Sequence, residues 1–229
     1  AGVEYLKTRK EINKNKIGLL GHSEGGIIAA IVAGNSNDIN YIVSLAASGV
    51  RGDKNMLQLR ELILCNTSIP EIEIYKGQEE LRGAYNIILN AASNDESLKK
   101  EIKSYFKATM GYGATDEDIN ESSKALLSPW MYYFLRFDPS TAFRKVKCPV
   151  LALNGDKDMH LFPEGNLIAI KEAVLSGGNK KVTTKNLPGL NHFFQETPTG
   201  SPSEYSEIAQ TFSPIALEEI SRWILLQTK

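Results

Sequence analysis

Residues 21–26, which read GHSEGG, constrain the fold of this chain more than any other segment. They directly follow an apolar run at 17–20 and directly precede a second apolar run at 27–32. Such a succession predicts a strand, a sharp turn and a helix with no spacer between them. The turn places Ser23 at its tip, so the pattern predicts a serine hydroxyl that projects above the edge of a sheet.

Two glycines flank this serine at the spacing that such a turn favours. Because a residue at the tip of the turn has strained backbone angles, the positions two before and two after it favour glycine. Gly21 and Gly25 occupy these two positions. The helix that begins at Glu24 directs backbone N–H groups toward the serine, so we expect the Glu24 N–H to stabilise an oxyanion formed there.

An acid and a histidine follow later in the chain, each after a predicted strand. The apolar run at 149–153 leads into a polar loop that contains Asp156 and Asp158. A second predicted strand, at 181–187, leads into a loop that contains His192. The order serine, acid, histidine is the order of the catalytic triad in the α/β-hydrolase fold.

Chemistry near neutral pH assigns a role to each of these groups. Ser23 alone is a weak nucleophile, so we expect His192 to accept its proton and a carboxylate to orient the imidazole. We favour Asp158 over Asp156 as that carboxylate. Asp158 lies three residues beyond Gly155, which is the usual placement, whereas Asp156 is so close to the strand that a structural role in the loop suits it better.

The sequence contains two further histidines, and each has two interpretations. His22 lies inside the predicted turn, where we expect it to point away from the serine and to pack beside the turn. His160 follows the acid loop; a contact with substrate is one interpretation, and we favour an ordinary solvated loop histidine.

Four blocks together resemble a known group of enzymes: GLLGHSEGG, SPWMYYFLRFDP, PVLALNGDKD and LPGLNHFFQ. They look like the α/β-hydrolases of the EstD-like carboxylesterase branch, near the dienelactone hydrolase and serine aminopeptidase groups. The resemblance covers most of the chain outside residues 55–124. It implies hydrolysis of short-chain acyl esters by a triad of Ser23, Asp158 and His192, without a metal ion or an organic cofactor.

The resemblance also implies that further sequence belongs upstream. In this fold the turn follows the fifth of eight strands, whereas only 22 residues precede Ser23 here. We therefore expect the carboxyl-terminal part of an α/β-hydrolase fold, with parallel strands five to eight. The second oxyanion donor would lie upstream of Ala1, so the isolated chain is expected to be a weak catalyst. An unpaired first strand would favour self-association or pairing with the missing part.

The pattern of apolar residues divides the chain into two parts. Residues 1–50 and 138–229 alternate predicted strands and helices, which indicates the hydrolase core. Residues 51–137 show helical spacing only and indicate a helical lid. The aromatic segment 129–137, which includes Trp130, either lines a substrate pocket or packs the lid. The last helix, predicted at 214–227, has an apolar stripe of Ile215, Leu217, Ile220, Trp223 and Ile224.

Composition excludes several functional classes. The 229 residues are 42% hydrophobic and 23% charged, as in soluble globular proteins, and the net charge of −1 gives no attraction to nucleic acid. No apolar run is long enough to span a membrane, and the two cysteines have no metal-ligand spacing. A thioesterase, a peptidase and a non-catalytic binding protein remain alternatives to an esterase, and the compartment, bacterial cytoplasm or periplasm, stays open.

Overall fold

The computed structural model describes residues 1–64, 68–111 and 113–229 and divides them into two compact units. One unit consists of Ala1–Val50 and Asp138–Lys229, and the other of Arg51–Phe137. These bounds coincide with those of the predicted core and the predicted helical segment. Cys65, one of the two cysteines, lies outside the described residues, and Cys148 is free.

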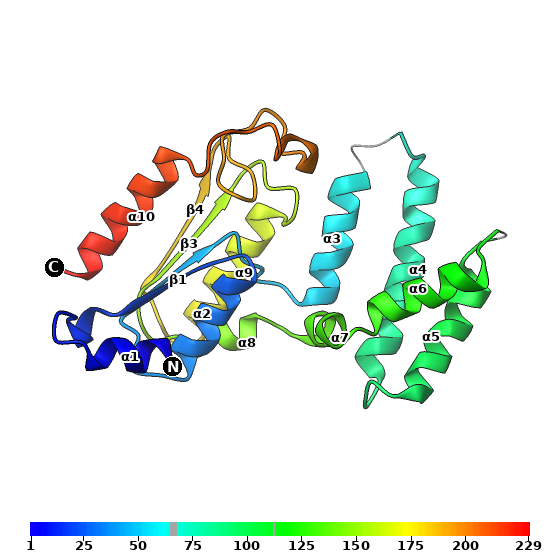
Figure 1. Cartoon of the computed structure of the whole chain (residues 1–229), viewed down its shortest axis with the longest axis horizontal. Coiled ribbons are helices and arrows are strands. Elements are labelled where there is room, and N and C mark those ends of the chain that lie inside the picture. Colours follow the sequence, from blue (N-terminus) through cyan, green and yellow to red (C-terminus); the bar gives the residue numbers. More distant parts are fainter. Residues whose placement is uncertain (65–67, 112) are drawn as a thin grey trace. The chain divides into compact units, whose positions relative to one another are not determined.

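The first unit contains four parallel strands in the order β1-β2-β3-β4 (Figure 1). Parallel neighbours need a crossover, and helix α2 connects β1 to β2 while α9 connects β3 to β4. The fold is therefore α/β. The bounds are β1 Gly18–His22, β2 Tyr41–Leu45, β3 Val150–Gly155, β4 Val182–Leu187, α2 Glu24–Gly34 and α9 Pro163–Ser176.

Helices cover both faces of this sheet. Helices α2 and α9 pack on one face with the short helix α8, Ser140–Phe143, between them, and α10, Pro214–Gln227, lies on the other face (Figure 1). Val43 and Leu151 belong to the same buried cluster as Trp223 of α10. The remaining short elements are α1 Gly2–Thr8 and the 3-10 turns η1 Lys14–Lys16 and η2 Pro202–Glu204.

The predicted stripe of helix α10 is only partly correct. Ile220 and Trp223 are buried as expected, but Ile215 and Leu217 are 52% and 51% exposed. The buried face runs through Ala216, Ile220 and Trp223, which follow one another at spacings of four and three. Since each residue turns the helix by about 100°, the positions on either side of Ala216 point away from the sheet.

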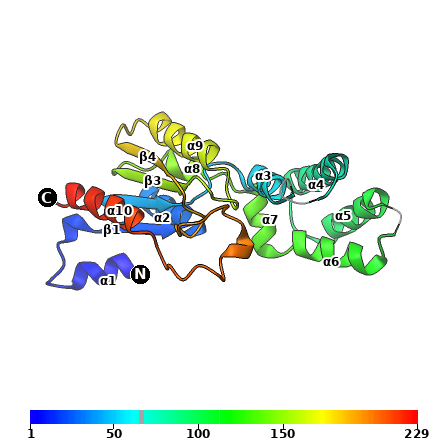
Figure 2. The same ribbon diagram turned by 90° about the horizontal axis from the view of Figure 1, so that it is seen from above.

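The second unit consists of helices α3 to α7. Helix α3 packs on α4, α4 on α5 and α5 on α6, whereas α7 packs mainly on α3 and α4 (Figure 2). Their bounds are α3 Gly52–Leu64, α4 Glu71–Asn90, α5 Glu96–Thr109, α6 Asp116–Leu126 and α7 Pro129–Arg136. They enclose a core of their own that includes Ile88, Ile102, Phe106 and Leu135. That this unit is a lid stays a prediction.

The aromatic helix α7 divides its residues between two surroundings. Leu135 is fully buried in the core of the helical unit, whereas Trp130 is 50% exposed and stacks on Phe134, with ring centroids 4.9 Å apart. Packing inside the helical unit therefore accounts for Leu135, and a role of Trp130 in a substrate pocket stays a prediction. No helix among the described residues has the length and apolar character needed to cross a membrane.

Candidate active site

The turn between β1 and α2 has the strained geometry that the sequence predicts. Ser23 has a φ of 53° and a ψ of −120°, values that an L-residue with a side chain rarely adopts. The Ser23 N–H donates to the carbonyl oxygen of Leu45 at 2.7 Å, which ties the turn to strand β2. A Cβ atom on Gly21 would lie 2.0 Å from the carbonyl oxygen of Gly25, so only glycine fits at position 21.

The requirement for glycine two residues after the serine is wrong in this chain. A Cβ atom on Gly25 would meet no heavy atom of the described residues within 4 Å. The crowded position is Gly26, where a Cβ atom would lie 2.5 Å from Ser44 Oγ and 2.7 Å from Ala47 Cβ. The position after the serine that requires glycine is therefore Gly26, and the requirement comes from the close packing of α2 against β2.

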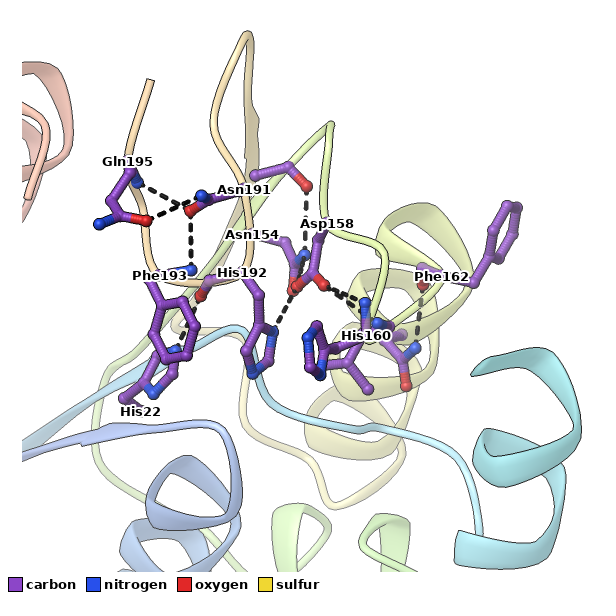
Figure 3. Close-up of polar contacts among 12 residues, drawn as sticks. His22, Asn154, Asp158, His160, Phe162, Asn191, His192, Phe193 and Gln195 are labelled. Carbon is purple, nitrogen blue, oxygen red and sulfur yellow. Dashed lines mark hydrogen bonds and ion pairs between the residues drawn. The ribbon is translucent and has the colours of Figure 1, made fainter. Parts of the chain in front are cut away.

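His192 and Asp158 meet beyond the carboxyl ends of β3 and β4. The Nδ1 atom of His192 lies 2.8 Å from Asp158 Oδ2, and the imidazole points at the carboxylate (Figure 3). The Asp158 side chain is fully buried and that of His192 is nearly so. With Nδ1 occupied as the donor to this carboxylate, Nε2 is left as the basic nitrogen of the ring.

The Asp158 carboxylate is surrounded by donors. Oδ2 also accepts a hydrogen bond from Asn154 Nδ2 at 2.9 Å, and Oδ1 accepts from the backbone N–H groups of His160 and Leu161 at 2.7 and 3.0 Å. These hydrogen bonds compensate for the cost of burying the carboxylate. Asn154 precedes the acid by four residues and was not singled out from the sequence.

Asp156 has the structural role that its position suggested. It is exposed, and its Oδ1 accepts a hydrogen bond from the Gly189 N–H at 2.7 Å. The Lys157 N–H donates to the carbonyl oxygen of Leu190 at 3.0 Å. The two contacts join the loop after β3 to the loop after β4, which carries His192.

A buried asparagine shapes the His192 loop. Asn191 is fully buried, and its Oδ1 accepts from the N–H groups of Phe193 and Gln195 at 2.9 and 3.0 Å. Phe194 completes the turn with a φ of 59°. The sequence offered one signal for this role, because asparagine side chains commonly bond to the backbone two residues further on.

His22 does more than pack beside the nucleophile turn. Its Nε2 lies 2.8 Å from the carbonyl oxygen of His192 and must donate to it, and the two ring centroids are 4.8 Å apart (Figure 3). Burial lowers the pKa of His22, and this outweighs the bond to His192, which raises it. Since His22 adjoins Ser23 in the chain, this bond links the turn of the serine to the loop of the histidine.

The interpretation of His160 as a solvated loop histidine is wrong. The residue is half-buried, and its ring stacks on that of His192 with centroids 4.6 Å apart and planes 19° apart. Burial, and then the neighbouring His192, lower the pKa of His160. The tight turn of residues 158–161 around the Asp158 carboxylate turns this ring inward, and nothing local in the sequence indicates that contact.

Ser23, Asp158 and His192 thus come from loops at one edge of the sheet. The carboxyl ends of parallel strands meet at the same edge, which is where such folds bind ligands. Glu24 is the first residue of helix α2, so its N–H lies at the positive end of the helix dipole. Among the described residues, no group of three or more His, Cys, Asp or Glu side chains could hold a metal ion.

Residues 1–124 match the family model described as the BAAT / acyl-CoA thioester hydrolase C-terminal domain. The match includes the Ser23 turn and more than half of the 229 residues. No curated protein matches the sequence of the chain.

Three solved structures that are similar to this chain are distant from it in sequence. An acetyl xylan esterase from Paenibacillus sp. R4 is 14% identical with a TM-score of 0.49, over 98% of this chain and 49% of that one. An esterase from Pyrococcus furiosus is 13% identical with a TM-score of 0.48, over 99% of this chain and 59% of that one. The 2,6-dihydroxy-pseudo-oxynicotine hydrolase is 16% identical with a TM-score of 0.44, over 83% and 38%. The chain spans less than two thirds of the length of each of these proteins.

Proposed function

The chain belongs to the BAAT / acyl-CoA thioester hydrolase C-terminal family, a hydrolase family of the α/β-hydrolase fold, and from that membership we propose that it is a serine acyl hydrolase. Ser23 is the nucleophile, His192 the general base and Asp158 the carboxylate that orients the base. The observation that carries the proposal is the buried hydrogen bond of 2.8 Å between His192 Nδ1 and Asp158 Oδ2.

The reaction proceeds in two acyl transfers. His192 Nε2 accepts the Ser23 hydroxyl proton while Ser23 Oγ bonds to the carbonyl carbon of the substrate. The tetrahedral oxyanion is stabilised by the Glu24 N–H at the start of α2. As the bond to the leaving group breaks, His192 returns its proton to that group. Water then attacks the acyl-enzyme by the same route and releases the acid and Ser23.

Asp158 stabilises the charged intermediate of both steps. When His192 holds two protons, the carboxylate lies within hydrogen-bond distance of the imidazolium, and three other donors hold the carboxylate in place. His22 keeps the backbone of His192 in place through the bond to its carbonyl oxygen. These contacts preorganise the base, so little rearrangement accompanies proton transfer.

A short-chain carboxylic ester is the substrate class that the resemblance to EstD-like carboxylesterases implies, and an acyl thioester is the second candidate. The description of the matched family, which names acyl-CoA thioester hydrolases, supports the thioester. An ester and a thioester of the same acid transfer the same acyl group to Ser23 and form the same acyl-enzyme. The same catalytic residues can therefore act on both. No cofactor takes part in this mechanism.

The competing proposal is a hydrolase-fold protein that binds a ligand without turnover. Such a protein has no need for a buried acid bonded to a histidine, or for a serine with strained backbone angles at the same edge of the sheet, and both features occur here. The geometry therefore supports catalysis over binding alone.

Trapping the acyl-enzyme tests the proposal even where turnover is slow. The chain is mixed with p-nitrophenyl acetate or with acetyl-CoA, quenched in acid and digested, and acetylated peptides are identified by mass spectrometry. We expect acetylation of Ser23, none in Ser23→Ala, and a strong reduction in His192→Ala. Acetylation that persists unchanged in Ser23→Ala would contradict the proposal, and the preferred donor distinguishes an esterase from a thioesterase.

A further inference from the structure

Three aromatic rings stack in a row, and the first of them is the imidazole of the proposed general base, His192. The His160 ring lies between those of His192 and Tyr205, with centroid distances of 4.6 and 5.8 Å and interplanar angles of 19° and 24°. Phe193 closes the side of the stack with an edge contact to Tyr205 at 5.0 Å. The proposed mechanism uses only His192, so the other two rings need an explanation of their own.

Both of these rings bury a polar atom without a partner. His160 Nε2 and the Tyr205 hydroxyl are shielded from solvent, and neither has a hydrogen-bond partner among the described residues. Burying such atoms unpaired costs free energy, and folded proteins avoid it unless a ligand or a function requires it. Two orphan groups on stacked rings, next to the base of a hydrolase, indicate a place where the substrate supplies the partner.

The loop that carries Tyr205 is held firmly against the acid loop. The Glu204 carboxylate accepts hydrogen bonds from the Thr199 hydroxyl at 2.6 Å and from the Gly200 N–H at 3.3 Å. Gly200 has a φ of 84°, and a Cβ atom there would lie 1.8 Å from the carbonyl oxygen of Lys157. These contacts fix residues 199–204, directly before Tyr205, next to the loop that carries Asp158.

We propose that His160 and Tyr205 form a polar subsite for the leaving group of the substrate. It accepts an ester or thioester whose alcohol or thiol part carries a hydroxyl or amide close to the scissile bond. The Tyr205 hydroxyl and His160 Nε2 bond to that group, and both are positioning residues. The inference rests on the proposed function and adds its specificity.

The direction of proton transfer indicates that His160 and Tyr205 contact the leaving group of the substrate rather than its acyl group. His192 must lie within hydrogen-bond distance of the leaving oxygen or sulfur in order to protonate it, whereas the acyl carbonyl oxygen faces the start of α2. The part of the substrate nearest to rings stacked on His192 is therefore the part attached to the leaving atom. Burial and the positive charge that His192 acquires both favour a neutral His160, which can donate or accept as the substrate requires.

The test compares two esters that differ in one hydroxyl, 2-hydroxyethyl acetate and ethyl acetate. Tyr205→Phe removes only the phenolic oxygen, and we expect kcat/KM to fall about tenfold for the hydroxylated ester and less than about twofold for ethyl acetate. His160→Phe keeps a flat ring and is expected to remove the same preference. Tyr75→Phe, an exposed tyrosine of the helical unit, is the matched control and leaves both values unchanged.

A second measurement needs no turnover. In Ser23→Ala the two esters are titrated while the imidazole NMR signal of His160 is followed; 2-hydroxyethyl acetate should shift it saturably, and the additional change Tyr205→Phe should weaken that response. Equal responses to both esters, or responses unaffected by Tyr205→Phe, would overturn the subsite. Absence of Ser23 acylation would instead contradict the proposed function, so the two failures are distinguishable.

Discussion

Asp156 and Asp158 are two residues apart and are the same amino acid, yet their surroundings differ completely. Asp158 is buried and accepts four hydrogen bonds, one of them from His192, whereas Asp156 is exposed and accepts one from Gly189. An asparagine at 158 would offer an N–H₂ or a neutral oxygen to His192 and would also face the Asn154 amide. An asparagine at 156 still accepts from the Gly189 N–H.

We therefore expect Asp158→Asn to lower the acylation rate of Ser23 by about 10³ to 10⁴ and Asp156→Asn to change it by less than about threefold. Stopped-flow release of p-nitrophenol under single-turnover conditions measures both rates. Similar small losses in the two variants would exclude Asp158 as the triad acid.

His22 and His160 also predict how stability depends on pH. The pKa of each is lowered from 6.5, first by burial. Between pH 6.5 and the lower native value the unfolded chain binds more protons than the folded chain, so this part of the stability is complete above pH 6.5 and declines as the pH falls through that window. The neighbouring Asp158 carboxylate raises the pKa of both histidines and so reduces this loss of stability. A charged His192 lowers the pKa of both and so increases the loss.

His160→Phe keeps the ring and removes one titrating group, so we expect its urea midpoint to fall less than that of the wild type between pH 7 and pH 5. Midpoints measured at half-unit steps of pH check this. Parallel curves for the two proteins would show that His160 is not linked to stability.

At the scale of the elements, the turn between β1 and α2 has room for a side chain at one of the two glycines that flank Ser23 but not at the other. Gly21→Ala places a Cβ atom 2.0 Å from the backbone of Gly25, whereas Gly25→Ala places one in open space within the described structure. We expect Gly21→Ala to lower the free energy of unfolding by about 1–3 kcal/mol or more, and Gly25→Ala to change it by less than about 1 kcal/mol. Urea unfolding of the two variants measures the difference, and equal losses would contradict the geometry of the turn.

The same turn shows which parts of the site a sequence can predict. Ser23, Asp158 and His192 each follow a strand that the sequence predicts, and those strands coincide with β1, β3 and β4 of the structure. The importance of Gly26 depends instead on how closely α2 approaches Ser44, and the role of His22 depends on a carbonyl oxygen 170 positions away. Contacts of this kind arise from tertiary packing and leave no local pattern.

Helix α10 likewise shows that local patterns predict the position of an element but not its tertiary contacts. The bounds of α10 agree with the predicted range 214–227 because a proline begins the helix and apolar residues recur along it. Which of those apolar residues face the sheet was not predictable, since Ile215 and Leu217 are as apolar as Ile220. In the structure the small Ala216 faces the sheet and is fully buried, whereas its two larger neighbours are about half exposed.

At the scale of the molecule, strand β1 is an edge of the four-stranded sheet, and Leu20 in it is 54% exposed. An apolar edge strand is a template for pairing with another strand, and we propose that this edge pairs with a second polypeptide segment or a second copy of the chain. We expect concentration-dependent association by light scattering, reduced in Leu20→Lys, which places a charge on the edge. A clean monomer at all concentrations in the wild type would exclude pairing with a second copy of the chain.

The central claim is that a strained serine, a buried histidine and a buried aspartate act as one unit. Labelling with a fluorophosphonate probe tests it most directly, because the probe reacts covalently only with an activated serine. The account predicts a single label on Ser23 that is absent in Ser23→Ala and much slower to form in His192→Ala and Asp158→Asn. Labelling at another residue, or a rate at Ser23 unaffected by the loss of His192, would contradict it.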